Sequence, residues 1–83
     1  MKRIGIICGG FSSEFEISLK SANTIIANFP ADFETVMIVL SREGWNVNKA
    51  SGDVPFDIRT MTFLDDSVEK KIDAALVYTH GDP

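Results

Sequence analysis

The sequence predicts an α/β fold: a small Rossmann-like domain on a mainly parallel sheet, with an antiparallel hairpin extension. Residues 3–8 are expected to form the first strand, because the continuous apolar run from Ile4 to Cys8 is typical of a strand buried on both faces. A glycine pair and an amphipathic helical stripe follow, and a second apolar run comes at residues 36–40. A strand, a helix and a strand in this order form a right-handed parallel unit.

The helix is expected to begin after Ser13, a good N-cap residue, with Glu16 three residues later completing a capping box. It should run to about Asn28, because Pro30 cannot continue a helix. Its apolar residues form one stripe at helical spacing, which should pack against the sheet: Phe15, Leu19, Ala22, Ile26 and Phe29.

The rest of the chain alternates between short strands and turns. The apolar strand at 36–40, a turn at 41–44 and an alternating segment at 45–48 predict a hairpin. Residues 50–57 are expected to form a loop, 58–64 a strand and 65–67 a turn. Residues 68–71 fit either a short return strand or a helical turn, and 72–79 fit a final strand. Residues 1–83 should therefore make a single domain.

Composition excludes several function classes. A hydrophobic content of 45% argues against disorder, and a net charge of −4 disfavours a nucleic-acid partner. No apolar run approaches the length of about 18 residues that a membrane span needs. The apolar run after Met1 is too short for a signal peptide, and the single cysteine, Cys8, excludes an intrachain disulfide. These features suit a cytoplasmic protein.

The turn between the first strand and the helix is the candidate site. Gly9 and Gly10 allow a sharp turn and the close approach of a ligand, although a turn needed only for the fold is the alternative. Their spacing is neither a dinucleotide fingerprint nor a P-loop. Glu14 and Glu16 in the first helical turn would repel a phosphate and favour a ligand with a cationic group. Because Glu16 has a structural role as a cap, Glu14 is the stronger functional candidate.

Three further residues are candidates. Ile17 and Ser18 stand at i+3 and i+4 from Glu14, on the same helical face. Ile17 fits the wall of a small apolar pocket or simple core packing equally well, and Ser18 is explained more simply as a surface hydroxyl that bonds locally. His80 follows the last strand, where ligand residues gather in open α/β sheets, or else it bonds a loop. Cys8 is interpreted as a buried structural thiol.

Two more groups of residues have simple structural explanations. Trp45 and Phe56 are expected to be core or interface aromatics. Asp65 and Asp66 are a pair of turn carboxylates, and no residues at metal-ligand spacing surround them. We therefore expect no metal site in these residues.

The turn and helix resemble the opening motif of the D-alanine–D-alanine ligases, bacterial ATP-grasp enzymes of peptidoglycan precursor synthesis. The matching residues are Gly9-Gly10, followed by Ser13-Glu14-Phe15-Glu16-Ile17-Ser18-Leu19-Lys20-Ser21. Residues 74–81, which end in His-Gly, are similar to the family's next landmark. The Gly-Glu-Asp-Gly type segment that follows there in the family lies beyond Pro83. We therefore expect residues 1–83 to be the N-terminal pre-ATP-grasp domain of a longer ligase.

The resemblance implies roles for these residues. Glu14 would face the ammonium of the first D-alanine as a catalytic and substrate-binding residue, and Ile17 would face its methyl group. The same substrate subsite would include Ser18, His80, Gly9 and Gly10. ATP and Mg²⁺ would be bound by domains outside this fragment, which would be inactive alone, and the whole enzyme would be a homodimer.

Two alternatives stay open. The first is a non-catalytic α/β ligand-binding domain that shares only the strand, turn and helix. The second is a related ATP-grasp ligase that joins D-alanine to D-lactate or D-serine.

Overall fold

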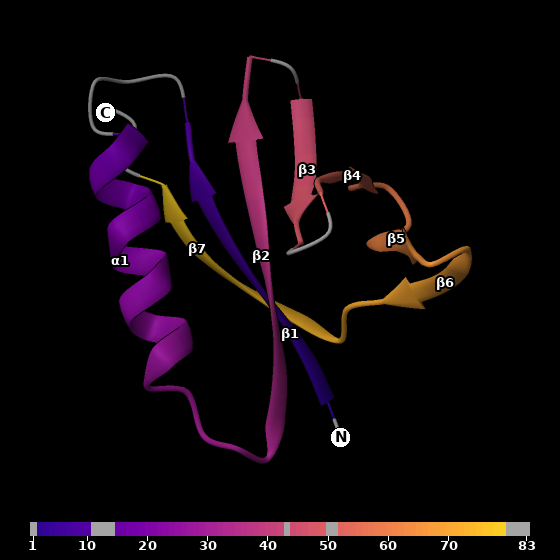
Figure 1. The fold of residues 1–83 in the computed structure, drawn as a ribbon, viewed down its shortest axis with the longest axis horizontal. Coiled ribbons are helices and arrows are strands. Elements are labelled where there is room, and N and C mark those ends of the chain that lie inside the picture. Colours follow the sequence, from indigo (N-terminus) through magenta and orange to yellow (C-terminus); the bar gives the residue numbers. More distant parts are fainter. Residues whose placement is uncertain (1, 11–14, 43, 50–51, 80–83) are drawn as a thin grey trace.

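The computed structural model describes residues 2–10, 15–42, 44–49 and 52–79 (Figure 1). The helices and strands of these residues are β1 (Lys2–Gly9), α1 (Phe15–Ala27), β2 (Phe33–Ser41), β3 (Gly44–Asn48), β4 (Val54–Asp57), β5 (Thr62–Asp65), β6 (Val68–Lys71) and β7 (Ala74–Thr79). The strands form one sheet in the order β6-β5-β4-β3-β2-β1-β7. β1 pairs in parallel with β2 and β7, and β3 to β6 extend the sheet as an antiparallel meander. This confirms the predicted α/β class.

β1 is the central strand of the parallel part. It lies between β2 and β7, and its residues from Ile4 to Gly9 are all buried. A strand covered on both faces has no solvated side, which explains why its apolar residues are continuous rather than alternating.

Two apolar clusters cover the opposite faces of the parallel strands. On one face Ile4, Ile6 and Cys8 pack with Ala22 of α1. On the other face the cluster joins β1 and β2 to the meander, and it consists of Ile7, Val36, Ile38, Val47, Phe56, Phe63 and Ile72. Figure 1 shows α1 and the meander on opposite sides of the parallel strands. The described residues therefore form three layers.

α1 packs through the stripe that its spacing predicts. Ala22 is fully buried, and Leu19, Ile26 and Phe29 of the predicted stripe pack against the same cluster. Ile25, which the predicted stripe did not include, packs against it as well. The helix ends at Ala27, three residues before Pro30. The predicted helix is confirmed, whereas its expected N-cap, Ser13, lies outside the described residues. No helix in the described parts of the chain has the length and apolar character needed to cross a bilayer.

The predicted loop at 50–57 is wrong in its second half, because Val54–Asp57 forms β4. Phe56 is buried and lies opposite Phe63 of β5, so burial of two aromatic side chains outweighs the weak strand propensity of a short segment with Pro55 in it. The prediction that Phe56 is a core residue is confirmed. Trp45 is half-buried and packs against the same cluster.

The predicted strand at 58–64 begins later than expected. The Asp57 carboxylate accepts the backbone N–H of Arg59 at 2.9 Å, and the Met61 N–H donates to the Asp57 carbonyl at 2.7 Å. These local bonds close a turn, so β5 starts only at Thr62.

Of the two structures left open for residues 68–71, the return strand is observed as β6. Asp66 and Ser67 have φ angles of 53° and 71°, and they form the two-residue connection of the β5–β6 hairpin. Left-handed conformation at both positions is what the twist of a tight hairpin requires.

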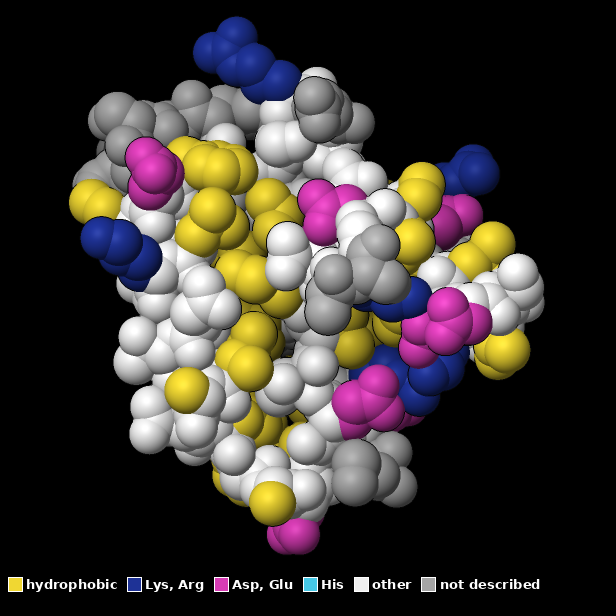
Figure 2. All heavy atoms as spheres, viewed as in Figure 1, with side chains coloured by type: hydrophobic (Ala, Val, Ile, Leu, Met, Phe, Trp, Pro, Cys, Tyr) yellow, Lys and Arg dark blue, Asp and Glu magenta, His cyan; other side chains and the backbone are white. Residues whose placement is uncertain are grey.

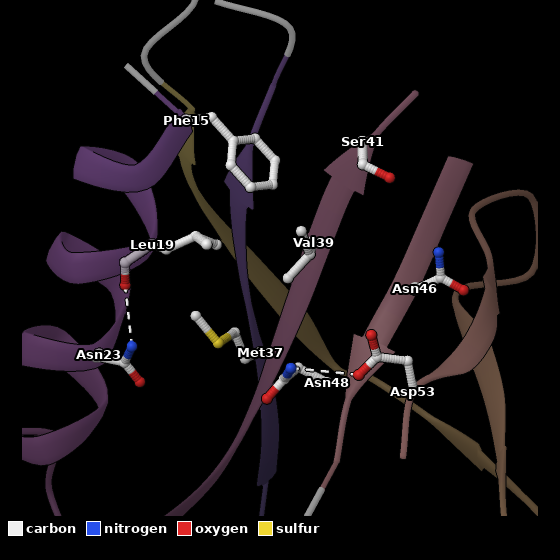
Figure 3. A pocket seen from close by; sticks show the side chains of 9 residues that line it. All are labelled: Phe15, Leu19, Asn23, Met37, Val39, Ser41, Asn46, Asn48 and Asp53. Atoms are coloured by element: carbon white, nitrogen blue, oxygen red, sulfur yellow. Dashed lines mark hydrogen bonds between the residues drawn. The ribbon is translucent and has the colours of Figure 1, made fainter. Parts of the chain in front are cut away.

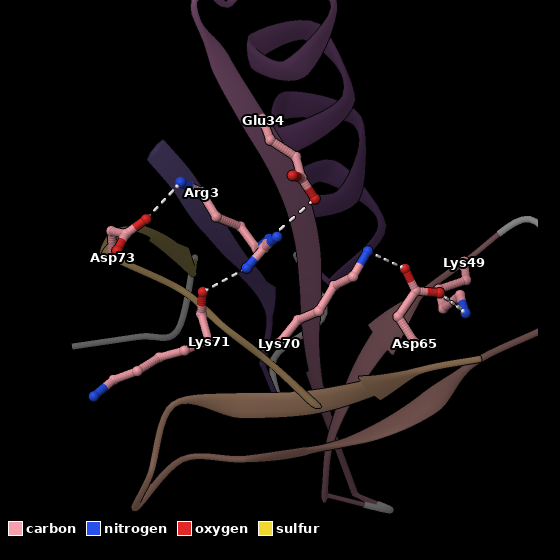
Figure 4. A network of polar contacts seen from close by, with 7 residues as sticks. All are labelled: Arg3, Glu34, Lys49, Asp65, Lys70, Lys71 and Asp73. Carbon is pink, nitrogen blue, oxygen red and sulfur yellow. Dashed lines mark hydrogen bonds and ion pairs between the residues drawn. The ribbon is translucent and has the colours of Figure 1, made fainter. Parts of the chain in front are cut away.

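Arg3 ties β1 to the neighbouring strands at the end away from the candidate site (Figure 4). Its Nε lies 3.0 Å from Glu34 Oε2 on β2, and its Nη1 donates to the Lys71 carbonyl at 2.8 Å. Its backbone N–H donates to Asp73 at 2.8 Å. The position where the meander returns to the parallel strands is therefore fixed by hydrogen bonds.

A second polar group holds the meander strands together. Asp65 on β5 forms ion pairs with Lys49, which follows β3, and with Lys70 on β6 at 2.7 Å (Figure 4). Hydrogen bonds from these two ammonium groups lower the pKa of Asp65 from its ordinary value of 3.8 to about 2. This carboxylate, predicted only as a turn residue, is a structural partner of two cations.

Candidate functional site

The candidate site lies where β1 and β7 end beside the first turn of α1. Gly9 ends β1, and in the sheet it is paired with Leu40 of β2 and Thr79 of β7. Phe15 begins α1 after the turn. The carboxyl ends of two neighbouring parallel strands and a helix N-terminus thus meet, which is the usual place for a ligand in an open α/β sheet.

Gly9 is required by the backbone itself. Its φ is +94°, and a Cβ at this position would lie 2.4 Å from the carbonyl oxygen of Leu40 and 3.0 Å from the ring of Phe15. Gly10 follows with a φ of +116°, and its N–H donates to the same Leu40 carbonyl at 2.9 Å. The fold alone therefore explains the first glycine, and a ligand role for the pair stays a prediction.

Ser18 is not the surface residue that the sequence suggested. Its side chain is completely buried, and its Oγ accepts the backbone N–H of Gly9 at 2.9 Å. The expectation of a surface hydroxyl is wrong because Ser18 lies one turn before Ala22, on the side of α1 that faces β1. The structure thus brings two of the predicted site residues, Gly9 and Ser18, into direct contact.

Ile17 has the opposite environment. It precedes the buried Ser18 but is 53% exposed, so the alternative of simple core packing is wrong. An exposed isoleucine in the first turn of a helix, next to the ends of the parallel strands, is available to contact a small apolar group. Glu14 and His80, the two strongest candidates from the sequence, lie outside the described residues. In sequence, Glu14 directly precedes α1, which begins here, and His80 directly follows β7, which ends here.

Cys8 is buried at the end of β1, and its Sγ lies 3.6 Å from the carbonyl oxygen of Ile38. Burial raises the pKa of this thiol to about 11. The nucleophilic thiolate is therefore scarce at neutral pH, which agrees with the prediction of a structural thiol. Within the described ranges, no His, Cys, Asp and Glu side chains group in a way that could hold a metal ion.

A groove of about 400 Å³ adjoins this site on the face of the sheet that α1 covers (Figures 2 and 3). Its apolar lining consists of Phe15, Leu19, Met37 and Val39, and its polar lining of Asn23, Ser41, Asn46, Asn48 and Asp53. Asn48 donates to Asp53 at 3.2 Å across the rim.

Sequence reasoning missed this groove. The alternating segment at 45–48 carried a signal for it, since alternation puts Asn46 and Asn48 on one face of β3. The groove needs α1 as its opposite wall, however, and the distance between a helix and a strand cannot be read from either pattern. Phe15 joins the two features, because it lines the groove and its ring lies 3.0 Å from where a Cβ of Gly9 would stand.

Comparisons with known proteins agree on one family. No family model matches the chain. It is 37% identical over 81 residues to a D-alanine–D-alanine ligase of Vibrio atlanticus, covering 94% of this chain and 24% of that protein. It is 36% identical over 84 residues to a D-alanine–D-alanine ligase of Parabacteroides distasonis, covering 99% of this chain and 26% of the relative.

Solved structures give the same result. D-alanyl-alanine synthetase A from Vibrio cholerae aligns over 99% of this chain and 25% of its own, with a TM-score of 0.77 and 34% identity. The D-Ala:D-Ser ligase VanG from Enterococcus faecalis aligns over 96% of this chain and 29% of its own, with a TM-score of 0.76 and 25% identity. The chain spans about a quarter of the length of the curated relatives it matches, in their N-terminal region.

Proposed function

The chain belongs to the D-alanine–D-alanine ligase family, whose N-terminal region it matches, and from this premise we propose that it is the substrate-binding N-terminal domain of such a ligase. The whole enzyme would join two D-alanine molecules into the dipeptide used in peptidoglycan synthesis. ATP, when bound, supplies the phosphoryl group that activates the carboxylate of the first D-alanine. The amino group of the second D-alanine then displaces phosphate.

The observation that carries this proposal is that the carboxyl ends of β1 and β7 meet the first turn of α1, in which Ile17 is 53% exposed. In the proposed subsite, Ile17 lies against the methyl group of the first D-alanine. Glu14 binds its ammonium group, and His80 helps to position the amino acid. The turn at Gly9 and Gly10 shapes the backbone beside it. A small apolar wall suits the methyl group of alanine, and a carboxylate beside it suits the ammonium group, which leaves the carboxylate of the substrate free to react.

ATP and Mg²⁺ are proposed to bind in parts of the enzyme outside these 83 residues. The glycine motif supports this, because it has neither the spacing of a dinucleotide site nor the lysine of a P-loop. A homodimer in the cytoplasm is proposed as well. The apolar side chains of Leu76 and Val77 on the outer strand β7, which are 39% and 64% exposed, are compatible with further packing partners.

The test is ATP-dependent phosphate release by the full-length parent protein with D-alanine as the sole amino acid, with the product identified by its mass. Release of phosphate together with D-alanyl-D-alanine is the expected result. Release of phosphate only when D-serine or D-lactate is added would indicate one of the related ligases. The similarity to a D-Ala:D-Ser ligase is the reason to include D-serine in the assay. If the folded parent shows no turnover, the alternative of a non-catalytic ligand-binding domain would be favoured instead.

A further inference from the structure

Ser18 occupies the position where α1 meets the end of β1. Its side chain has no exposed surface, so a substrate in the candidate site has no access to it in this arrangement. Its hydroxyl oxygen accepts the N–H of Gly9 at 2.9 Å, which joins two backbone segments nine residues apart. This bond links the last residue of β1 to the first full turn of α1.

The segment that Ser18 holds has little freedom elsewhere. On the side of β2, the carbonyl oxygen of Leu40 lies only 2.4 Å from where a Cβ of Gly9 would stand, and the N–H of Gly10 donates to that same oxygen at 2.9 Å. The Ser18 hydroxyl fixes the helix side of this turn, while Leu40 fixes its sheet side. The end of β1 is thus held from both neighbouring elements.

Ile17 takes its direction from the same contact. Adjacent residues of an α-helix point about 100° apart, so a buried Ser18 leaves the preceding side chain on the flank of the helix, where it is 53% exposed. A rotation or shift of the first turn of α1 would move Ile17 directly. A shift of about 1 Å in a substrate-positioning group can cost about 100-fold in rate.

We propose that Ser18 is a positioning residue of the D-alanine subsite: its hydroxyl locks α1 to Gly9 and thereby sets where Ile17 meets the substrate methyl group. This inference rests on the proposed function and changes the role of Ser18 from a substrate contact to a support for one.

The test is Ser18→Ala in the full-length enzyme, with Ala22→Gly as the matched control. Ala22 is equally buried one turn later in α1, so its replacement loosens the same helix while leaving the bond between Ser18 and Gly9 in place. The KM for D-alanine should rise about tenfold in Ser18→Ala and stay within about twofold in Ala22→Gly, with the KM for ATP unchanged in both. Both variants should lower the Tm by a few degrees.

A second readout separates positioning from stability. D-2-aminobutyrate carries one methylene more than D-alanine, and one methylene changes kcat/KM by about 10–200-fold in a well-formed apolar pocket. The preference for D-alanine should fall about fivefold or more in Ser18→Ala only. Equal preference in both variants, or an unchanged KM for D-alanine in Ser18→Ala, would overturn the positioning role while the ligase activity of the parent stands. A parent that makes no dipeptide would instead overturn the proposed function.

Discussion

At the scale of single residues, the environments of Gly9, Ile17 and Ser18 divide the motif into buried and exposed positions. Gly9 and Ser18 are buried and bonded to each other, and Ile17 between them in sequence is exposed. All three were candidates from the sequence, but their division was not predictable from it. Burial of Ser18 depends on how α1 rests on β1, and the helical spacing fixes only which residues share a face.

Replacing Gly9 by alanine should destabilise the fold by about 3 kcal/mol or more. A non-glycine residue at positive φ costs about 1–3 kcal/mol, and overlap with the Leu40 carbonyl adds about as much again because a backbone oxygen cannot turn aside. Gly44→Ala is the matched control, since Gly44 has a φ of +111° but no atom within 4 Å of an added Cβ. Denaturant unfolding of both variants measures the difference, and equal losses would contradict the crowding at Gly9.

Replacing Glu14 by glutamine in the parent enzyme should lower kcat/KM for D-alanine by about 10–100-fold, because a neutral amide replaces the carboxylate proposed to bind the ammonium. Glu16→Gln removes an equal charge two residues away, from an exposed position in α1. Steady-state kinetics should show a small effect in this second variant. A loss of the same size in both would point to the general charge of the helix end instead of a specific contact.

At the scale of secondary-structure elements, regular patterns were predictable and short ones were not. β1, α1, β2 and the β2–β3 hairpin follow from apolar runs and helical spacing over many residues. β4 was missed and the start of β5 misplaced, because four-residue strands are decided by pairing of Phe56 with Phe63 and by the side chain of Asp57. The groove beside α1 was missed for a related reason, since its walls come from separate elements.

The ion pairs of the meander should make its stability depend on pH in acid. The pKa of Asp65 is lowered to about 2 in the folded chain, so its stabilising effect is complete above an ordinary carboxyl pKa near 3.8. It is lost as the pH falls from about 4 to about 2. Asp65→Asn should therefore be less stable than the original chain at pH 6, and the two should converge near pH 2.

Denaturant unfolding at a series of pH values measures this convergence. Asp66→Asn removes a neighbouring carboxylate that forms no ion pair among the described residues, so its stability difference should change less over the same range. A difference for Asp65→Asn that is constant from pH 6 to pH 2 would show that the ion pairs do not couple to folding.

At the scale of the whole molecule, the described residues place the candidate site at one end of the sheet. The parallel strands are covered on one face by α1 and on the other by the meander, and the candidate residues gather at one end of this arrangement. The matched relatives are about four times as long. The fold class was predictable from the sequence, since the strand–helix–strand order indicated an α/β fold. The glycine and glutamate motif likewise indicated the family.

The 83-residue chain alone should show no ATP-dependent phosphate release with D-alanine, while the full-length parent does. The proposed subsite would hold one end of one substrate, and the phosphoryl donor would bind elsewhere. Both proteins are compared in the same assay at equal concentration. Turnover by the 83 residues would show that nucleotide binding resides within them.

The position of Trp45 gives this molecule a built-in optical probe. It is the sole tryptophan of the chain, and it packs against the cluster on the meander face, whereas α1, the helix of the described residues, covers the other face. Tryptophan fluorescence should therefore report on one layer and far-ultraviolet circular dichroism at 222 nm largely on the other. If the two signals change at the same denaturant concentration, the layers unfold as one cooperative unit, and separate midpoints would reveal an intermediate with one layer lost.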